Sequence, residues 1–184
     1  DDSACNLAAV NLLGFIQPMH NHPSIEYSSP AELMEQVIRI MVTAQDIIVD
    51  AASYPNEKIR ANSHNFRPLG LGFTNLAAAL MLQGHPYDSD SGRDQAAIWM
   101  NFVALCAHRT SADLAERMGA YSGYNGESHQ RVISKHGLAA NKYVQHEDAV
   151  WPSCVTWDDI RHRPMRNAQL TLLAPCGTMG YLLD

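Results

Sequence analysis

The sequence predicts an α/β fold in which helices outweigh strands. Two short apolar runs, residues 68–73 and 169–174, border on proline or glycine and have the length of buried strands. Two longer stretches, residues 30–53 and 92–118, are rich in apolar residues and suit helices. Because such strands and helices are interleaved along the chain, we expect an α/β arrangement.

The first third of the chain is predicted to form a strand, a loop and a long helix. Residues 4–16 are apolar and suit a buried strand, alone or leading into a helical turn, and residues 17–29 form a loop with two prolines. Ser29 is the expected N-cap of the helix, with Pro30 at its first position and Glu32 completing a capping box. Apolar residues at helical spacing continue this helix to about Ser53.

The run over residues 68–73 contains Gly70 and Gly72, which let another backbone pass close to this strand. A dinucleotide-binding fingerprint would need a third glycine where Asn75 stands, so close strand packing is favoured over cofactor binding. Thr74 or Asn75 caps the helix that follows.

The second half of the chain is predicted to be mainly helical before its last strand. The helix over residues 92–118 ends at Gly119, and a further helix lies near residues 127–136. Asp158 or Asp159 opens at most a short turn, and residues 169–174 form the final strand.

Composition excludes several classes of function. The chain of 184 residues carries a net charge of -6 and no cluster of basic residues, which argues against a nucleic-acid surface. No segment is long and apolar enough for a membrane helix, and no signal peptide begins the chain, so we expect a cytoplasmic protein. His20 and His22 lie in the first loop without the spacing of a metal site, and we expect them to be solvated.

Four cysteines occur without a CxxC pair, and free thiols are favoured over disulfides in a chain of this size. Cys106 lies in an apolar helix and is interpreted as a core residue, whereas Cys154 receives no role. For Cys5, which precedes an apolar strand, a buried structural thiol and a redox thiol are equally compatible with the sequence.

The last strand leads into a glycine-containing turn that opens a helix. Backbone N–H groups of residues 176–180, with the Thr178 hydroxyl, would point at one spot and suit a phosphate. There is no P-loop spacing and no lysine, which disfavours nucleoside triphosphate hydrolysis. The alternative is an ordinary strand-to-helix turn.

Four segments in this order resemble the large catalytic subunit of ribonucleotide reductase, specifically its adenosylcobalamin-dependent class: ACNLAAVNLL, ELMEQVIRIMVTAQDIIVDAASYP, RPLGLGFTNLAAALM and RNAQLTLLAPCGTMG. Residues 17–28 and 120–163 match less clearly. The resemblance implies that residues 1–184 are a single segment, truncated at both ends, of a ten-stranded α/β barrel built around a finger loop.

The resemblance also implies the chemistry. In this family a thiyl radical abstracts the 3′ hydrogen of a ribonucleotide, and a cysteine pair supplies two electrons as the 2′ hydroxyl leaves as water. Cys5 would be one member of that pair, since its thiolate can exchange with a second dithiol. Substrate phosphates would bind the loop formed by Pro175, Cys176, Gly177, Thr178 and Met179. The resemblance implies ribonucleoside diphosphate reduction, adenosylcobalamin, a thioredoxin-type reductant and a homodimer for the full enzyme.

Two departures qualify this expectation. The family's Asn-Pro-Cys-Ser-Glu motif, which carries the radical cysteine, lies just upstream of the matching segment, so we expect the isolated chain to be inactive. Cys176 stands where the family commonly has threonine or serine.

Because the radical cysteine is missing, the alternative function is a non-catalytic fragment that binds a phosphate ester or is structural. A partial barrel also leaves strand edges unpaired, from which we expect self-association.

Overall fold

The computed structural model describes residues 2–16, 29–143 and 156–183, with the side chains of residues 138–143 left aside. Its elements, in order, are β1 (Asn6–Asn11), α1 (Leu13–Ile16), α2 (Pro30–Ala51), α3 (Glu57–Phe66), β2 (Leu69–Thr74), α4 (Leu76–Leu82), α5 (Asp90–Met118), α6 (Gly126–Tyr143), α7 (Trp157–Ile160) and α8 (Gly177–Leu183). In the described part of the chain no helix is long and apolar enough to cross a membrane.

Helix α2 begins at its predicted N-cap, and helix α5 ends at its predicted glycine. The Glu32 N–H donates to the Ser29 hydroxyl over 3.2 Å at the start of α2. The start of α5 differs from the prediction by two residues, because Ser89 accepts from the Gly92 N–H and so caps the helix earlier. Gly119, with a φ of 88°, ends α5 as predicted.

Helix α3 is missing from the prediction. Its N-cap is Asn56, whose side chain accepts from the Ile59 N–H over 2.9 Å. It ends at Arg67, a non-glycine residue in the left-handed region with a φ of 48°. Ser63 is the one buried residue of this helix. Only Ile59, Ala61 and Phe66 are apolar in this helix, so the apolar run that indicated the other helices is absent here.

The sheet among the described residues contains two parallel strands. β1 and β2 pair from Asn6 with Leu69 to Asn11 with Thr74. The predicted last strand runs beside β2 but forms a single parallel bridge, between Leu71 and Thr171, instead of a regular strand. We call residues 169–172 the third segment; its hydrogen bonds to β2 include Leu69 N–H to the Gln169 carbonyl, 2.9 Å.

The two glycines of β2 pack as predicted. A Cβ atom at Gly72 would lie 2.4 Å from the Leu172 carbonyl oxygen, and one at Gly70 would lie 2.6 Å from the Leu7 side chain. Gly72 has no room for a side chain, so this glycine lets the third segment lie close to β2. At Gly70 the exposed Leu7 side chain would have to move.

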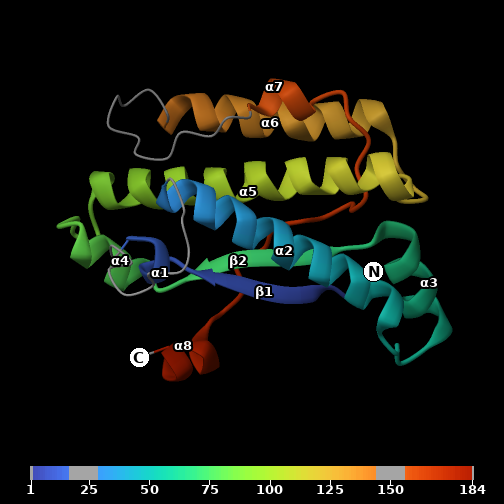
Figure 1. The fold of residues 1–184 in the computed structure, drawn as a ribbon, viewed down its shortest axis with the longest axis horizontal. Coiled ribbons are helices and arrows are strands. Elements are labelled where there is room, and N and C mark those ends of the chain that lie inside the picture. The colour runs from blue at the N-terminus through green and yellow to red at the C-terminus, as the bar shows by residue number, and fades with distance from the viewer. Residues whose placement is uncertain (1, 17–28, 144–155, 184) are drawn as a thin grey trace.

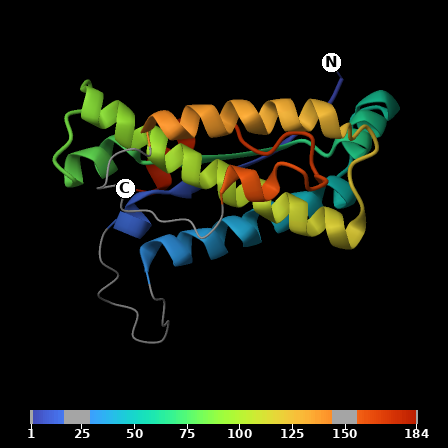
Figure 2. The same cartoon turned by 90° about the horizontal axis from the view of Figure 1, so that it is seen from above.

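Helices cover one face of the sheet. Figure 1 shows α2 and α5 above β1 and β2, with α6 and α7 beyond α5, and Figure 2 shows α5 crossing between α6 and α2. Fully buried side chains fill the space between these helices and the strands: Val10, Leu12, Met34, Ile38, Val42, Leu69, Leu71, Trp99 and Val103. A second core cluster, which includes Ile133, Trp157 and Ile160, joins α5 to α6 and α7.

The opposite face of the sheet, which we call the open face, carries Leu7 and Leu172, both exposed. In Figure 1, α8 lies on this side, away from α2 and α5. The helix-rich α/β arrangement is thus confirmed, whereas the partial ten-stranded barrel remains a prediction.

Candidate functional site

Cys5 lies immediately before β1 and is exposed, with a free thiol. This differs from the interpretation of Cys5 as a buried structural thiol. The residues on either side of it are held in place. The Ala4 N–H donates to the Ser63 hydroxyl over 3.1 Å, which ties this segment to α3.

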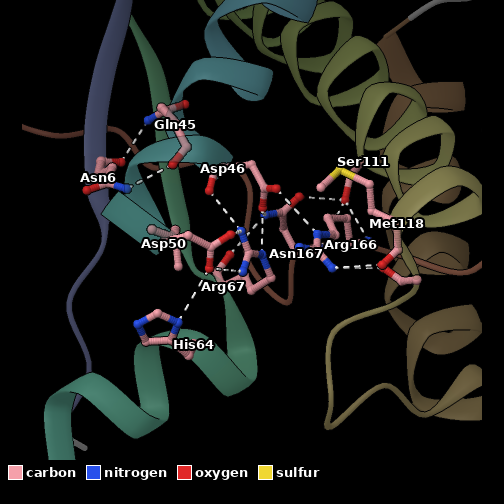
Figure 3. A network of polar contacts seen from close by, with 12 residues as sticks. Asn6, Gln45, Asp46, Asp50, His64, Arg67, Ser111, Met118, Arg166 and Asn167 are labelled. Atoms are coloured by element: carbon pink, nitrogen blue, oxygen red, sulfur yellow. Dashed lines mark hydrogen bonds and ion pairs between the residues drawn. The ribbon is translucent and has the colours of Figure 1, made fainter. Parts of the chain in front are cut away.

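Asn6 and Gln45 form a reciprocal pair of hydrogen bonds between β1 and α2. The Gln45 side-chain Nε2 donates to the Asn6 carbonyl over 2.7 Å, and the Asn6 Nδ2 donates to the Gln45 carbonyl over 3.0 Å. Figure 3 shows this pair beside a larger set of polar contacts. Cys5 therefore stands between two anchored residues, although its own side chain is exposed.

The larger set, which we call the strand-start network, lies where the strands begin (Figure 3); it consists of Asp46, Asp50, Arg67, Ser111, Arg166 and Asn167. The buried Arg67 guanidinium donates to Asp46 and Asp50 at 2.8 and 2.7 Å. Burial opposes the charge of Arg67, but its hydrogen bonds to Asp50 and Asp46 outweigh this effect and raise the pKa of Arg67. The hydrogen bond from Arg67 to Asp50 also lowers the pKa of Asp50.

Asn167 connects this network to the third segment. Its Nδ2 donates to the Asp46 carboxylate over 2.8 Å and to the Arg67 carbonyl over 3.1 Å. Its Oδ1 accepts from the Ser111 hydroxyl over 2.9 Å. One region of α2 therefore holds the starts of β1, β2 and the third segment together.

The predicted phosphate loop forms the start of α8. The Gly180 N–H donates to the Cys176 carbonyl over 2.8 Å, which is the first bond of the helix. The N–H groups of Gly177, Thr178 and Met179 precede it and therefore have no acceptor within the helix. The Cys176 thiol lies 3.4 Å from the Ala174 carbonyl and 3.8 Å from that of Phe73, so it contacts the backbone behind the loop.

A cavity of about 110 Å³ lies on the open face beside this loop. Its lining is largely apolar and includes Leu7, Ala9, Gly72, Leu172, Pro175 and Met179. The cavity thus joins the exposed side of β1 to the loop, at the end where the strands finish.

Cys5 and the loop lie at opposite ends of the sheet. Cys176 contacts Phe73, and Phe73 pairs with Val10, five residues after Cys5. At about 3.3 Å per residue, this register corresponds to about 16 Å along the strand. The structure therefore places the two predicted site regions near opposite ends of the sheet and does not bring them into contact.

A second cavity, of about 300 Å³, lies between α5, α6 and the third segment, and is lined by His108, His129 and His136. The His136 ring stacks on Trp157 with centroids 5.1 Å apart. Burial lowers the pKa of His108 to about 4 and also lowers the pKa values of His129 and His136. Among the described residues, no group of three or more histidine, cysteine or acidic side chains is placed to bind a metal ion.

The remaining sequence-predicted residues have simple outcomes. Cys106 is buried in the core, as predicted. His20, His22 and Cys154 lie outside the described residues. The sequence analysis missed the strand-start network and the histidine-lined cavity, because their members are far apart in the chain and follow no motif.

Comparisons with known proteins agree with the resemblance stated above. The family model for the ribonucleotide reductase barrel domain matches residues 1–184. A vitamin B12-dependent ribonucleotide reductase of Streptantibioticus cattleyicolor is 36% identical over 199 residues, covering 100% of this chain and 33% of the relative. One from Rhodopirellula baltica is 38% identical over 192 residues, covering 100% of this chain and 18% of the relative.

A more distant relative is the ribonucleoside-diphosphate reductase large subunit of Arabidopsis thaliana, 26% identical over 195 residues, with 100% of this chain and 23% of the relative covered. The chain spans a third or less of the length of these relatives. Because the family match extends over the whole chain, the chain belongs to the ribonucleotide reductase family and corresponds to part of its barrel domain.

Proposed function

We propose that this segment serves a ribonucleoside-diphosphate reductase that makes deoxyribonucleotides by thiyl-radical chemistry. In this proposal Cys5 supplies one of the two reducing thiols, and residues 175–179 bind the substrate phosphates. The observation that carries the proposal is the placement of Cys5, whose exposed thiol stands between two anchored residues at the edge of the open face.

The chemistry of Cys5 balances in electrons and atoms. Two thiols together give up two electrons and two protons as one S–S bond forms. The C2′–O bond of the ribose breaks, and one proton leaves with the hydroxyl as water. The other proton and the two electrons form a C2′–H bond in its place. A thioredoxin-type dithiol then reduces the disulfide by thiol–disulfide exchange, which requires a thiol accessible to a second protein. The exposure of Cys5 supports this role.

The start of α8 supports the role of the loop. The N–H groups of Gly177, Thr178 and Met179, which have no acceptor within α8, and the Thr178 hydroxyl are suitable donors for phosphate oxygens. The thiol of Cys176 contacts backbone carbonyls. The thiol therefore lies behind the loop. It stands where the family commonly has a threonine or serine hydroxyl, but the backbone of the loop does not depend on that hydroxyl. The small cavity beside the loop is of a size for a phosphate or a sugar substituent.

The relatives named as vitamin B12-dependent support adenosylcobalamin as the cofactor of the full protein. The cavity beside the loop does not fit a corrin ring, because about 110 Å³ corresponds to the liquid volume of only a few water molecules. We therefore assign no described residue to this cofactor and derive no step through it.

The full protein is proposed to be a cytoplasmic homodimer without affinity for nucleic acid, in keeping with the acidic net charge of -6.

Substitution of Cys5 in the full-length protein tests the proposal. With ribonucleoside diphosphate, adenosylcobalamin and dithiothreitol, we expect Cys5→Ser to abolish multiple-turnover formation of deoxynucleotide, because no disulfide can form. Cys154→Ser is the matched control, since the same change is made at a cysteine without an assigned role. The 184-residue chain alone should give no product.

If Cys5→Ser retained the turnover of the unsubstituted protein, Cys5 would not be a reducing thiol. The alternative of a structural or phosphate-ester-binding segment would then be favoured. Binding of nucleotide that perturbs the amide signals of Gly177 and Thr178 would support the loop separately.

A further inference from the structure

We infer that Gln45 and Ser63 are positioning residues for the Cys5 thiol, which they hold through hydrogen bonds to the two residues that flank it. The inference rests on the proposed redox role of Cys5. It assigns to α2 and α3 a part in the reaction, through their hydrogen bonds to the residues on either side of Cys5.

Ser63 anchors the residue before Cys5. It is 1% exposed and is the one buried residue of α3. Its hydroxyl accepts from the Ala4 N–H over 3.1 Å, and its carbonyl accepts from the Arg67 N–H over 2.8 Å. Ser63 therefore links the segment that carries Cys5 to the strand-start network.

Gln45 anchors the residue after Cys5. Its side chain is buried and donates to the Asn6 carbonyl over 2.7 Å. The Gln45 Oε1 atom is also buried, but it has no hydrogen-bond partner in the described part of the chain. A buried unpaired acceptor is unfavourable, and an apolar side chain of similar size would avoid it. Packing alone therefore does not account for an amide at this position, whereas its bond to Asn6 does.

Gln45 acts from the side of the sheet that α2 covers. Side chains alternate along a strand, so Cys5 shares its side with Leu7, which is 59% exposed on the open face. The backbone is thus held from behind while the thiol faces the space that the substrate would occupy. A reacting group gains from being fixed in this way, because small displacements have large effects on rate.

Other contacts to this segment are weaker candidates for positioning. Lys58 pairs with Asp2, and the Asn62 side chain donates to the Asp2 carbonyl over 3.0 Å. These contacts are exposed, and exposed pairs contribute little. The buried Gln45 and Ser63 are therefore the residues to test.

The test uses the full-length protein with Gln45→Leu and Ser63→Ala. Gln36→Leu is the matched control, since it makes the same change at an exposed residue of the same helix. We expect Gln45→Leu to lower kcat by about tenfold to a hundredfold through displacement of the thiol. KM for the nucleotide should stay within about twofold, because the phosphate loop lies at the other end of the sheet. Ser63→Ala should act in the same direction with a smaller effect.

A second measurement follows the thiol itself. The rate at which iodoacetamide alkylates Cys5, quantified on the Cys5 peptide by mass spectrometry, should rise several-fold in Gln45→Leu and Ser63→Ala and stay unchanged in Gln36→Leu. A purely structural role would lower the midpoint of thermal unfolding but would leave the alkylation rate of the folded protein unchanged.

Two outcomes would overturn the inference: kcat of Gln45→Leu within twofold of the unsubstituted protein, or equal alkylation rates in all variants. If Gln45→Leu fails to fold, Ser63→Ala, a loss of one oxygen atom, provides the same two readouts. Retained turnover in Cys5→Ser would instead refute the proposed function. The alkylation rates would still show whether the two side chains hold Cys5, so the two failures are distinguishable.

Discussion

The two ends of the open face differ in how firmly they are built. At the Cys5 end, buried polar residues of α2 and α3, with Asn167 just before the third segment, hold the starts of the strands, and Arg67 is only 5% exposed. At the loop end, α8 has no buried residue, and Tyr181 and Leu182 are 89% and 78% exposed. The Cys5 end is therefore held by buried polar contacts, whereas α8 contributes no buried residue to the loop end.

Removing the central cation of the strand-start network should have the largest effect. We expect Arg67→Met to lower the free energy of unfolding by about 3–5 kcal/mol, because it leaves the buried Asp46 without its main partner. Urea unfolding followed by circular dichroism measures this. Arg93→Met is the control, since Arg93 forms exposed pairs with Asp88 and Asp90 and should cost about 0.5 kcal/mol or less. Equal losses of unfolding free energy in both variants would mean that the buried network stabilises the Cys5 end no more than an exposed ion pair does.

Acid should weaken the structure behind the third segment through His108. Burial depresses the pKa of His108 from 6.5 to about 4, so the folded state keeps this side chain neutral where the unfolded state takes up a proton. The free energy of unfolding is therefore unaffected by this histidine above pH 6.5. It falls as the pH is lowered from 6.5 towards 4, by about 3 kcal/mol at most. The groups that face it are His136, His129, Trp157 and the Ala104 carbonyl.

Urea unfolding at pH 7.5 and 4.5 checks this pH dependence. His108→Gln should reduce the difference between the two pH values, while His162→Gln, at an exposed residue, should leave it unchanged. A difference that is the same with and without His108 would assign the acid sensitivity to other groups.

A substitution in α8 should have the smallest effect. We expect Leu182→Ser to change the free energy of unfolding by less than about 0.5 kcal/mol, because the side chain is already exposed to water. The same urea unfolding experiment measures it. A loss of 2 kcal/mol or more, on the scale of a buried residue, would mean that the loop end is packed as firmly as the Cys5 end.

The sequence predicted the elements that carry local signals. The N-cap at Ser29, the glycines of β2 and the glycine after α5 each predicted the place of an element to within a few residues, because caps and close backbone approaches depend on neighbouring residues. The polar helix α3 has few apolar residues and was missed. The third segment was predicted as a full strand but makes one bridge.

The candidate site was predictable only in part. Cys5 and residues 175–179 were named from the family resemblance, and their roles remain predictions. The contacts behind Cys5 gave no signal, since Gln45 meets Asn6 across 39 positions and Asn167 meets Asp46 across 121. Such contacts depend on the folded arrangement of three helices and three chain segments, which no short motif encodes.

The position of the phosphate loop depends on the number of residues between the third segment and the loop more than on which residues they are. The third segment is tied to β2 at Thr171, and the phosphate loop begins only four residues later. Deleting one residue from this connection would draw the loop back by about 3.3 Å and turn the following side chains to the other face. Natural variants of this segment should therefore differ here by substitution and seldom by insertion or deletion.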